Sequence, residues 1–404
     1  MSSNGSASMA GLLNRRFVSL LIVSFLSSFL FAPLSALLPV YVEKALSGSP
    51  LFSGGLRALF LILGGLFAFP AGKLADDLGV KRVYVLGTIG SILAGMVFLS
   101  DSPLILSGLC IFIGISFGFN TAGGQSYLLG AAAPALIGTA SAGYFLGNTL
   151  GTASGSFIAG PIADVMGYRT LGTVACIASV GLIFIAALIL PGIPRSVASS
   201  GQTTRSLSGL SDLARRREVR LLLGIRYLPT CYWGTVTLLL PLLIYRLTGT
   251  NTAVTTFNAI SLTIAACFQI LTGRLCDRIG RWRPILISAS CVTLSALGLA
   301  FTAHTLTGLY VFGIMAAASA WSLSTTMPGL LQLIARDGEK GRVVGIAHVA
   351  WSAGMLSGNL GGGKLIEWGP ALPFGIAVAF CLGTVGCGWG LYRIYGSQKT
   401  QDVK

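Results

Sequence analysis

A short charged segment occurs twice in the chain, and each copy separates two long apolar stretches. The first copy is GKLADDLGVKR over 72–82, and the second is GRLCDRIGRWR over 273–283. The copies lie about half of the 404-residue chain apart, and Gly, Leu, Asp, Gly and Arg recur at the same offsets in both. Self-similarity at a fixed interval is the signature of a repeated structural unit. The sequence therefore predicts two related halves, each with a charged turn between two apolar helices.

The composition is that of a protein embedded in a membrane. Only 10% of the residues are charged and 53% are hydrophobic, and the mean hydropathy is +0.81. In a soluble domain about a quarter of the residues are charged. A membrane-spanning helix needs about 20 apolar residues, so this chain has room for about twelve of them. The predicted fold class is all-α and polytopic, with twelve transmembrane helices in two pseudo-symmetric six-helix bundles.

A stretch rich in Ser and Arg, with Pro194 and Gly201, interrupts the apolar pattern near the middle of the chain. It predicts an N-terminal bundle over 1–191, a cytoplasmic linker over 192–217 and a C-terminal bundle over 218–404. Long apolar runs mark the helices. The expected spans are 17–42, 53–72, 83–100, 104–127, 136–163, 170–191, 219–245, 252–274, 284–303, 306–334, 343–366 and 371–394.

The net charge of +15 is distributed unevenly along the chain. Lys and Arg gather near both ends, in the central linker and in the two repeated segments, which are alternate connections between the predicted helices. An excess of basic residues on the cytoplasmic side is typical of membrane proteins. The charge therefore predicts an integral protein of the plasma (inner) membrane with both termini in the cytoplasm. Its partner is the lipid bilayer, and we expect no binding to nucleic acid.

The repeated segments resemble the loop between helices 2 and 3 of the major facilitator superfamily, which recurs between helices 8 and 9. The family pattern is Gly, any residue, Leu, a small residue, Asp, Arg, any residue, Gly, Arg, then Lys or Arg. The second copy fits as far as Arg281, whereas the first has Asp77 and Val80 at positions that are usually basic. The resemblance implies a monomeric secondary transporter that works by alternating access. It also implies a gating role for Gly72, Asp76, Gly79, Arg82, Gly273, Asp277, Gly280, Arg281 and Arg283.

The predicted fifth helix ends in Ser-Phe-Ile-Ala-Gly-Pro over 156–161. This partly resembles the Gly-x-x-x-Gly-Pro element that exporters of the superfamily carry there, and it favours export. Gly160 and Pro161 are expected to bend the helix and help close the outer side. The same helix has small residues at every fourth position over 143–155, as does the eleventh helix over 350–362. Such stripes indicate either tight helix packing or sliding surfaces.

Four predicted helices, the first, fourth, seventh and tenth, carry polar and aromatic residues along one face. Their spacing of about three to four residues is that of a helix face, and polar faces avoid lipid. The resemblance places these four helices around a central cavity. For any single Ser or Thr, a hydrogen bond to its own helix is the alternative. The candidate substrate-binding residues are Ser28, Phe31, Asn120, Arg226, Thr230, Trp233, Trp321 and Thr325.

Arg226 is the one fixed charge well inside a predicted span. A cation there costs several kcal/mol unless it is paired or hydrated. Either its side chain reaches the cytoplasmic interface, or it meets an anionic or carbonyl-rich substrate in a cavity. The sequence leaves both interpretations open.

Proton coupling needs a titratable group that water reaches. No Asp or Glu lies near the middle of a predicted span, and His348 is the near-neutral titrator within one. The candidates for a coupling role are His348, for which ordinary packing is the alternative, and Asp164 near the outer end of the fifth helix.

Other chemistries fit the sequence poorly. The segment over 358–364 spells Gly, four residues, Gly and Lys, but Leu365 replaces the Ser or Thr that would hold magnesium. The two His and the scattered Cys have no metal-ligand spacing. We therefore expect no enzyme, no cofactor and no metal. The predicted function is export of a small organic molecule, a drug or metabolite, in exchange for protons. The alternatives are import or facilitated diffusion of an organic anion, with Arg226 as the cavity cation, and a membrane sensor.

Overall fold

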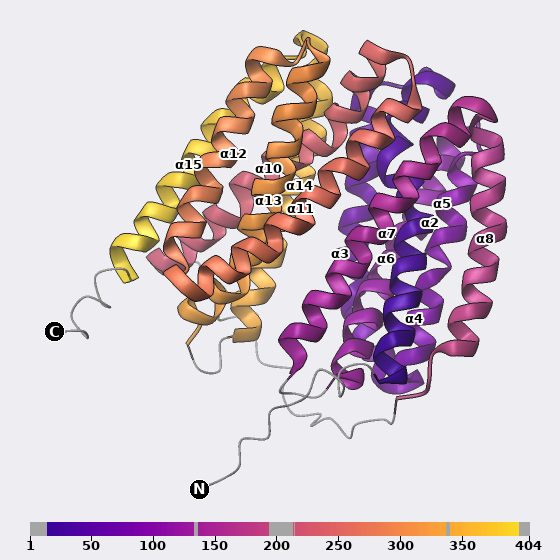
Figure 1. Ribbon diagram of the computed structural model, residues 1–404, viewed down its shortest axis with the longest axis horizontal. Coiled ribbons are helices and arrows are strands. Elements are labelled where there is room, and N and C mark those ends of the chain that lie inside the picture. The colour runs from indigo at the N-terminus through magenta and orange to yellow at the C-terminus, as the bar shows by residue number, and fades with distance from the viewer. Residues whose placement is uncertain (1–13, 133–135, 194–212, 214, 337–339, 396–404) are drawn as a thin grey trace, which may run out of the picture. The chain divides into compact units, whose positions relative to one another are not determined.

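The computed structural model describes residues 14–132, 136–193, 213, 215–336 and 340–395, and this part of the chain is almost entirely helical (Figure 1). The helices before residue 193 are α2 (Arg15–Leu46), α3 (Pro50–Leu78), α4 (Val80–Thr88), α5 (Gly90–Val97), α6 (Pro103–Ala131), α7 (Ile137–Val165) and α8 (Gly167–Ile189). Those that follow are α10 (Arg217–Thr248), α11 (Asn251–Ile279), α12 (Trp282–Thr302), α13 (Leu306–Ile334), α14 (Lys340–Leu365), the short 3₁₀ helix η3 (Ile366–Trp368) and α15 (Leu372–Tyr395).

Eleven spans in the described residues are long and apolar enough to cross a membrane. One of them, Val80–Val97, joins α4 and α5, which are separated at Ile89. The twelfth helix of the predicted set is α7, which has 29 residues and a high content of Gly, Ser and Thr. The predicted all-helical fold is therefore confirmed. The break at Ile89 is a difference from the continuous span expected over 83–100.

The repeated segments adopt the same local structure. Gly79 precedes α4 with φ 91°, and Gly280 follows α11 with φ 77°. Residues with a side chain rarely adopt positive φ, so both turns require glycine. The two charged segments are thus equivalent turns, each between the second and third helix of its half.

The chain divides into two compact units, which are described separately below. The first unit contains 1–41 and 59–199, and the second contains 42–58 and 200–404. Within the second unit, Arg246 at the end of α10 donates two hydrogen bonds to the Glu43 carboxylate, at 2.8 and 2.7 Å. Lys44 lies 5.1 Å from the centre of the Tyr245 ring. These contacts account for the grouping of 42–58 with the second unit.

Glycines bring the helices of each unit close together. In the first unit, a Cβ atom on Gly155 of α7 would lie 2.1 Å from the backbone oxygen of Phe29 in α2. In the second unit, a Cβ on Gly358 of α14 would lie 2.0 Å from the backbone oxygen of Cys231 in α10. Real atoms do not approach this closely, so only glycine fits at either position. Both stripes contact a helix of their own unit, which favours the interpretation of tight packing.

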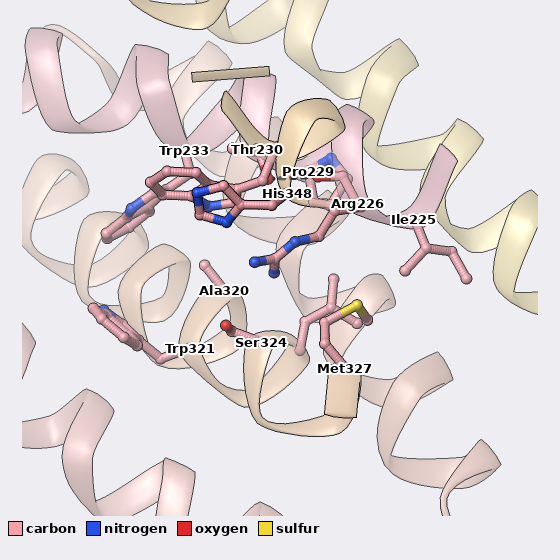
Figure 2. Close-up of a pocket in the computed structure, with 12 residues that line it drawn as sticks. Ile225, Arg226, Pro229, Thr230, Trp233, Ala320, Trp321, Ser324, Met327 and His348 are labelled. Atoms are coloured by element: carbon pink, nitrogen blue, oxygen red, sulfur yellow. Dashed lines mark hydrogen bonds between the residues drawn. The ribbon is translucent and has the colours of Figure 1, made fainter. Parts of the chain in front are cut away.

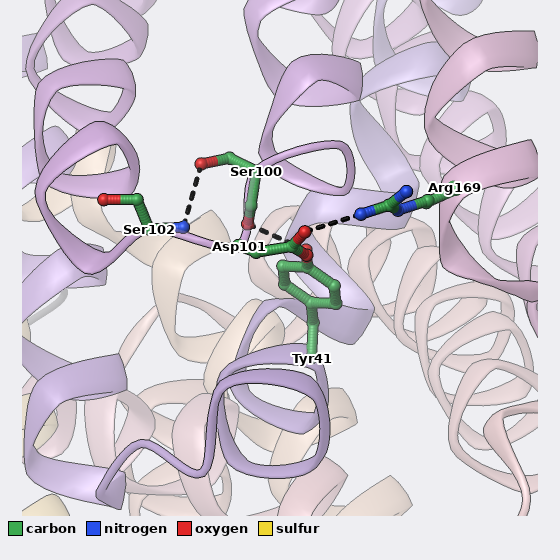
Figure 3. Close-up of polar contacts among 5 residues, drawn as sticks. All are labelled: Tyr41, Ser100, Asp101, Ser102 and Arg169. Carbon is green, nitrogen blue, oxygen red and sulfur yellow. Dashed lines mark hydrogen bonds and ion pairs between the residues drawn. The ribbon is translucent and has the colours of Figure 1, made fainter.

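Polar contacts fix the connection between α5 and α6 in the first unit (Figure 3). Arg169 donates a hydrogen bond to the Asp101 carboxylate at 2.6 Å, and the Tyr41 hydroxyl donates to the backbone oxygen of Ser100 at 2.9 Å. The Tyr41 ring also contacts Phe98 at 5.3 Å between ring centres. α2, α5 and α8 are thereby joined at this end of the unit.

Candidate substrate-binding pockets

The second unit contains a cavity of about 220 Å³ among α10, α13 and α14 (Figure 2). Three tryptophans, one arginine and one histidine dominate its wall. Five of the residues predicted from sequence line it, four as substrate-binding residues and His348 as a coupling residue. The lining residues are Ile225, Arg226, Pro229, Thr230, Trp233, Ala320, Trp321, Leu323, Ser324, Met327, His348 and Trp351.

The sequence of α10 explains the face that it presents to this cavity. Arg226, Thr230 and Trp233 follow one another at intervals of about one helical turn, and all three line the cavity. The Thr230 hydroxyl donates to the backbone oxygen of Arg226 at 2.6 Å, so its hydrogen is used within the helix. Pro229 has no N–H to offer to the helix turn before it. Figure 2 shows the guanidinium group of Arg226 extending from α10 towards Ala320 and Ser324 of α13.

Arg226 meets an aromatic face in place of a carboxylate. Its guanidinium carbon lies 6.0 Å from the centre of the Trp351 ring, within the range of a cation–π contact. His348 stacks on the same indole, with ring centres 5.5 Å apart and an angle of 26° between planes. In the described part of the chain, Arg226 forms no ion pair, and α13 and α14 contain no acidic residue. The positive charge is therefore available to a bound molecule.

A further polar atom in this wall has no partner. The indole N–H of Trp321 is buried and makes no hydrogen bond with any described residue. A buried donor without an acceptor costs about 1–3 kcal/mol. The second unit thus combines one cation and one unused donor with a largely aromatic surface.

The first unit contains a smaller cavity of about 150 Å³ with a different lining. Ser28 donates to the amide oxygen of Asn148 at 2.9 Å, and the Asn120 amide donates to Ser27 at 3.4 Å. Hydroxyl, amide and aromatic groups make up the wall, and no charged side chain among the described residues lines it. The lining residues are Ser27, Ser28, Phe31, Gly87, Gly90, Ser91, Phe117, Asn120 and Thr152.

The remaining predicted residues lie elsewhere. Thr325 is on α13 but does not line the cavity of the second unit, and its hydroxyl donates to the backbone oxygen of Trp321 at 2.9 Å. Gly160 and Pro161 are near the end of α7 in the first unit, as is Asp164. Of the two predicted coupling residues, His348 lines the cavity of the second unit, and Asp164 is not among the residues that line either of these cavities.

The predicted gating residues lie at the two equivalent turns. Gly72 is in α3 and Gly273 in α11, and no described atom lies within 4 Å of a Cβ added at either. Arg82 and Arg283 are in the first turns of α4 and α12. Arg281 donates a hydrogen bond to the backbone oxygen of Gly329 in α13, which ties the second turn to that helix. The side chains of Asp76 and Asp277 lie outside the described part of the chain.

Several lining residues were not predicted. Trp351 lies three residues after His348 in α14, so the two share a helix face, but its place in the cavity wall depends on how α14 packs against α10. Thr152 follows Gly151 of the small-residue stripe in α7, so it lies beside that stripe. Ser91 lies next to the break at Ile89, which an apolar sequence pattern does not reveal.

The comparisons with known proteins agree with this architecture. The family model described as Major Facilitator Superfamily matches residues 20–359. A "Multidrug resistance protein MdtH" from Aeromonas hydrophila is 27% identical over 226 residues, which are 52% of this chain and 53% of the relative. A second MdtH, from Aeromonas salmonicida, is 27% identical over 228 residues, with the same coverage. The chain thus spans about half the length of the curated relatives it matches.

Solved structures resemble the whole chain at low sequence identity. A mutant of the nucleoside transporter NupG has a TM-score of 0.77 at 16% identity, with 95% of this chain and 100% of that one covered. A POT family transporter in complex with 5-aminolevulinic acid has a TM-score of 0.74 at 14% identity, with 94% of this chain and 96% of that one covered. A bacterial homolog of the human lysosomal transporter Spinster has a TM-score of 0.72 at 14% identity, with 94% of this chain and 97% of that one covered. At these identities the likeness concerns the fold. The chain belongs to the major facilitator superfamily, a family of membrane transporters and not of enzymes, and has its twelve-helix fold.

Proposed function

We propose that this protein exports a small organic molecule, a drug or a metabolite, across the plasma (inner) membrane by alternating access. The observation that carries the proposal is the aromatic wall of the second-unit cavity, to which Trp233, Trp321 and Trp351 contribute. Indole rings offer large, rigid apolar surfaces for planar molecules. The partial similarity to the two MdtH proteins, which are named for multidrug resistance, supports export as the direction.

The size of the cavity supports a small cargo. Its volume of about 220 Å³ is below the roughly 300–1,000 Å³ of sites that enclose a drug-sized ligand. The cavity therefore accommodates one ring system and its polar substituent. The hydroxyl and amide groups of the first-unit cavity offer donors and acceptors for a neutral polar molecule.

Accumulation of fluorescent dyes in cells that lack their own efflux pumps tests this proposal. We expect the wild-type protein to lower the steady-state dye content, and Trp321→Ala to restore it. Trp389→Ala is the matched control, because Trp389 lies on α15, is 47% exposed and does not line the cavity. Wild-type expression that leaves the content of every tested dye unchanged would count against export.

A second candidate is uptake or facilitated diffusion of an organic anion. The observation that favours it is the charge of Arg226, which lines a cavity without a carboxylate partner in the described residues. Counterflow of a radiolabelled carboxylate in proteoliposomes, with equal pH on both sides, tests this candidate. Exchange that proceeds with wild-type protein and stops with Arg226→Gln supports it. Equal exchange by both proteins contradicts it.

The expected gating and topology belong to the same proposal. The two bundles, over 1–191 and 218–404, rock against each other around a substrate site near the midplane of the membrane. Both repeated turns and both termini are on the cytoplasmic side. Asp76 and Asp277 are proposed to latch that side. We expect Asp76→Asn to lower transport several-fold at unchanged expression, because a latch that fails favours one state of the cycle. Reconstituted vesicles containing the variant provide the measurement, and wild-type turnover would refute the latch.

A further inference from the structure

We propose that the cavity of the second unit binds an organic anion and a proton together, the anion at Arg226 and the proton on His348, so that each favours binding of the other. This inference rests on the second candidate function. It adds that the ion bound together with the anion is a proton, and that each of the two ligands raises the affinity for the other.

The geometry places both groups beside one indole ring. The Arg226 guanidinium carbon is 6.0 Å from the centre of the Trp351 ring, and the His348 ring centre is 5.5 Å from it. Arg226 comes from α10, and His348 and Trp351 come from successive turns of α14. All three line the same cavity. A molecule that fills this cavity therefore contacts a permanent cation and a titratable ring at once.

No other charged side chain in the described residues lines this cavity. α14 packs against α10, α13 and α15. α13 contains no charged residue, and the charge of α15 is Arg393 in its last turn. Glu218 in the first turn of α10 pairs with Arg216 at 2.9 Å, and Lys364 at the far end of α14 pairs with Glu367 at 2.5 Å. The other titratable side chains described on these helices are arginines near the ends of α10, tyrosines and cysteines, and none of them lines the cavity.

These charges determine whether the anion and the proton favour or oppose each other's binding. In the empty cavity, a proton on His348 places a second positive charge beside Arg226, and like charges in a membrane interior repel strongly. A bound anion offsets the charge of Arg226 and removes that repulsion. The proton in turn adds attraction for the anion. Because binding linkage is reciprocal, each ligand raises the affinity for the other by the same factor.

The consequence for transport is specific. Two ligands that favour each other's binding cross the membrane in the same direction, so an acidic exterior drives uptake of the anion. Exchange of cargo for protons needs the opposite relation, in which the two exclude each other. The effect of pH on anion binding at Arg226 and His348 therefore distinguishes the two candidate functions. Tighter binding at low pH supports uptake, and weaker binding at low pH supports exchange for protons.

Calorimetric titration of the purified full chain in detergent tests the inference. The probe is 2-naphthoate, and the uncharged 2-naphthamide is its matched control. We expect naphthoate to bind about three- to tenfold more tightly at about pH 5.5 than at about pH 7.5, since one linked proton allows at most about tenfold per pH unit. Comparison of buffers with different heats of ionisation should reveal proton uptake on binding. Naphthamide should bind with an affinity that does not depend on pH.

Three variants assign the effect to residues. His348→Gln should bind naphthoate with no pH dependence, and Arg226→Gln should lose naphthoate binding while it retains naphthamide binding. The matched control is His304→Gln, because His304 is the other histidine in the sequence and is exposed beyond the end of α12. It should behave as wild type. Thermal unfolding of each variant verifies that the fold is retained.

The outcomes distinguish failure of this inference from failure of the two candidate functions. Naphthoate binding that is equal at both pH values, or a pH dependence that survives in His348→Gln, overturns the inference and leaves the anion function intact. Wild-type protein that binds neither naphthoate nor any of a panel of carboxylates, yet lowers dye accumulation, overturns both the inference and the second candidate. In that case export remains.

Discussion

The two cavities occur in units of related design but differ in chemistry. In each unit the first and fifth helices, α2 with α7 and α10 with α14, are joined by glycines, and the charged turn has a glycine with positive φ. The cavity of the first unit is lined by Ser, Thr, Asn and Phe, whereas that of the second has Arg226, His348 and three tryptophans. The repeat thus preserves the backbone geometry while the lining residues diverge. The first cavity offers neutral hydrogen-bonding groups, and the second offers a cation with aromatic rings.

The shared scaffold predicts the largest effect. Gly358→Ala and Gly155→Ala should each destabilise the protein by about 2–3 kcal/mol, because each added Cβ overlaps a backbone oxygen that cannot move without shifting a helix. Gly361→Ala is the control, since no described atom lies within 4 Å of its added Cβ. Thermal unfolding in detergent provides the measurement. A large effect in one unit and none in the other would show that the two helix pairs are not equivalent.

The difference between the cavities predicts the next effect. Trp351→Leu should weaken binding of an aromatic carboxylate by about 2 kcal/mol, roughly thirtyfold, because the ring contacts both Arg226 and His348. The counterpart is Phe117→Leu in the first unit, where Phe117 stacks on Phe31 at 6.2 Å. Phe117→Leu should change naphthoate binding by less than about twofold, because the anion is held in the cavity of the second unit. Calorimetry with naphthoate compares them, and equal losses would contradict the assignment of the anion to the second unit.

Much of the fold was accessible from the sequence, because long apolar runs and a repeated charged turn leave few alternatives. The candidate pocket was only partly accessible. Arg226, Thr230 and Trp233 share one face of a single helix, so helical spacing was sufficient to group them. The contribution of Trp351 depends on the packing of α14 against α10, which spacing within one helix does not specify. Thr325 fits the spacing of α13, yet its hydroxyl is bonded to its own helix.

Contacts between residues far apart in the sequence show a second limit. Residues 42–58 belong to the second compact unit, although most of the first unit follows them in the chain. The two hydrogen bonds between Arg246 and Glu43 depend on residues far apart in the sequence. Hydropathy contains no information about such contacts. The break between α4 and α5 was missed for a similar reason, since Ile89 continues the apolar run on either side of it.

The charged turns predict a smaller effect. Arg281 donates a hydrogen bond to Gly329 of α13, and Val80 is its counterpart in the first copy. Arg281→Val should therefore loosen the second turn by about 1.5 kcal/mol, the lower end of the contribution of a hydrogen bond to a charged group. Hydrogen exchange of the backbone over 273–283 should quicken, while exchange over 72–82 stays unchanged. Val80→Ala serves as the control, because it removes no hydrogen bond. Unchanged exchange over 273–283 would mean that Arg281 does not hold the turn.

The smallest effect is expected in the neutral cavity. Ser28→Ala removes a hydrogen bond to Asn148 that joins α2 to α7, and an uncharged hydrogen bond contributes about 1 kcal/mol. We expect transport of a neutral substrate to fall about fivefold and naphthoate binding to change by less than about twofold, because the second cavity holds the anion. Thr173→Ala is a matched hydroxyl deletion, since the Thr173 hydroxyl is exposed on α8 and bonds its own helix, at 2.9 Å. A loss of naphthoate binding in Ser28→Ala as large as that in Trp351→Leu would mean that the two cavities act as one anion site, and the chemical difference between the units would then have no functional counterpart.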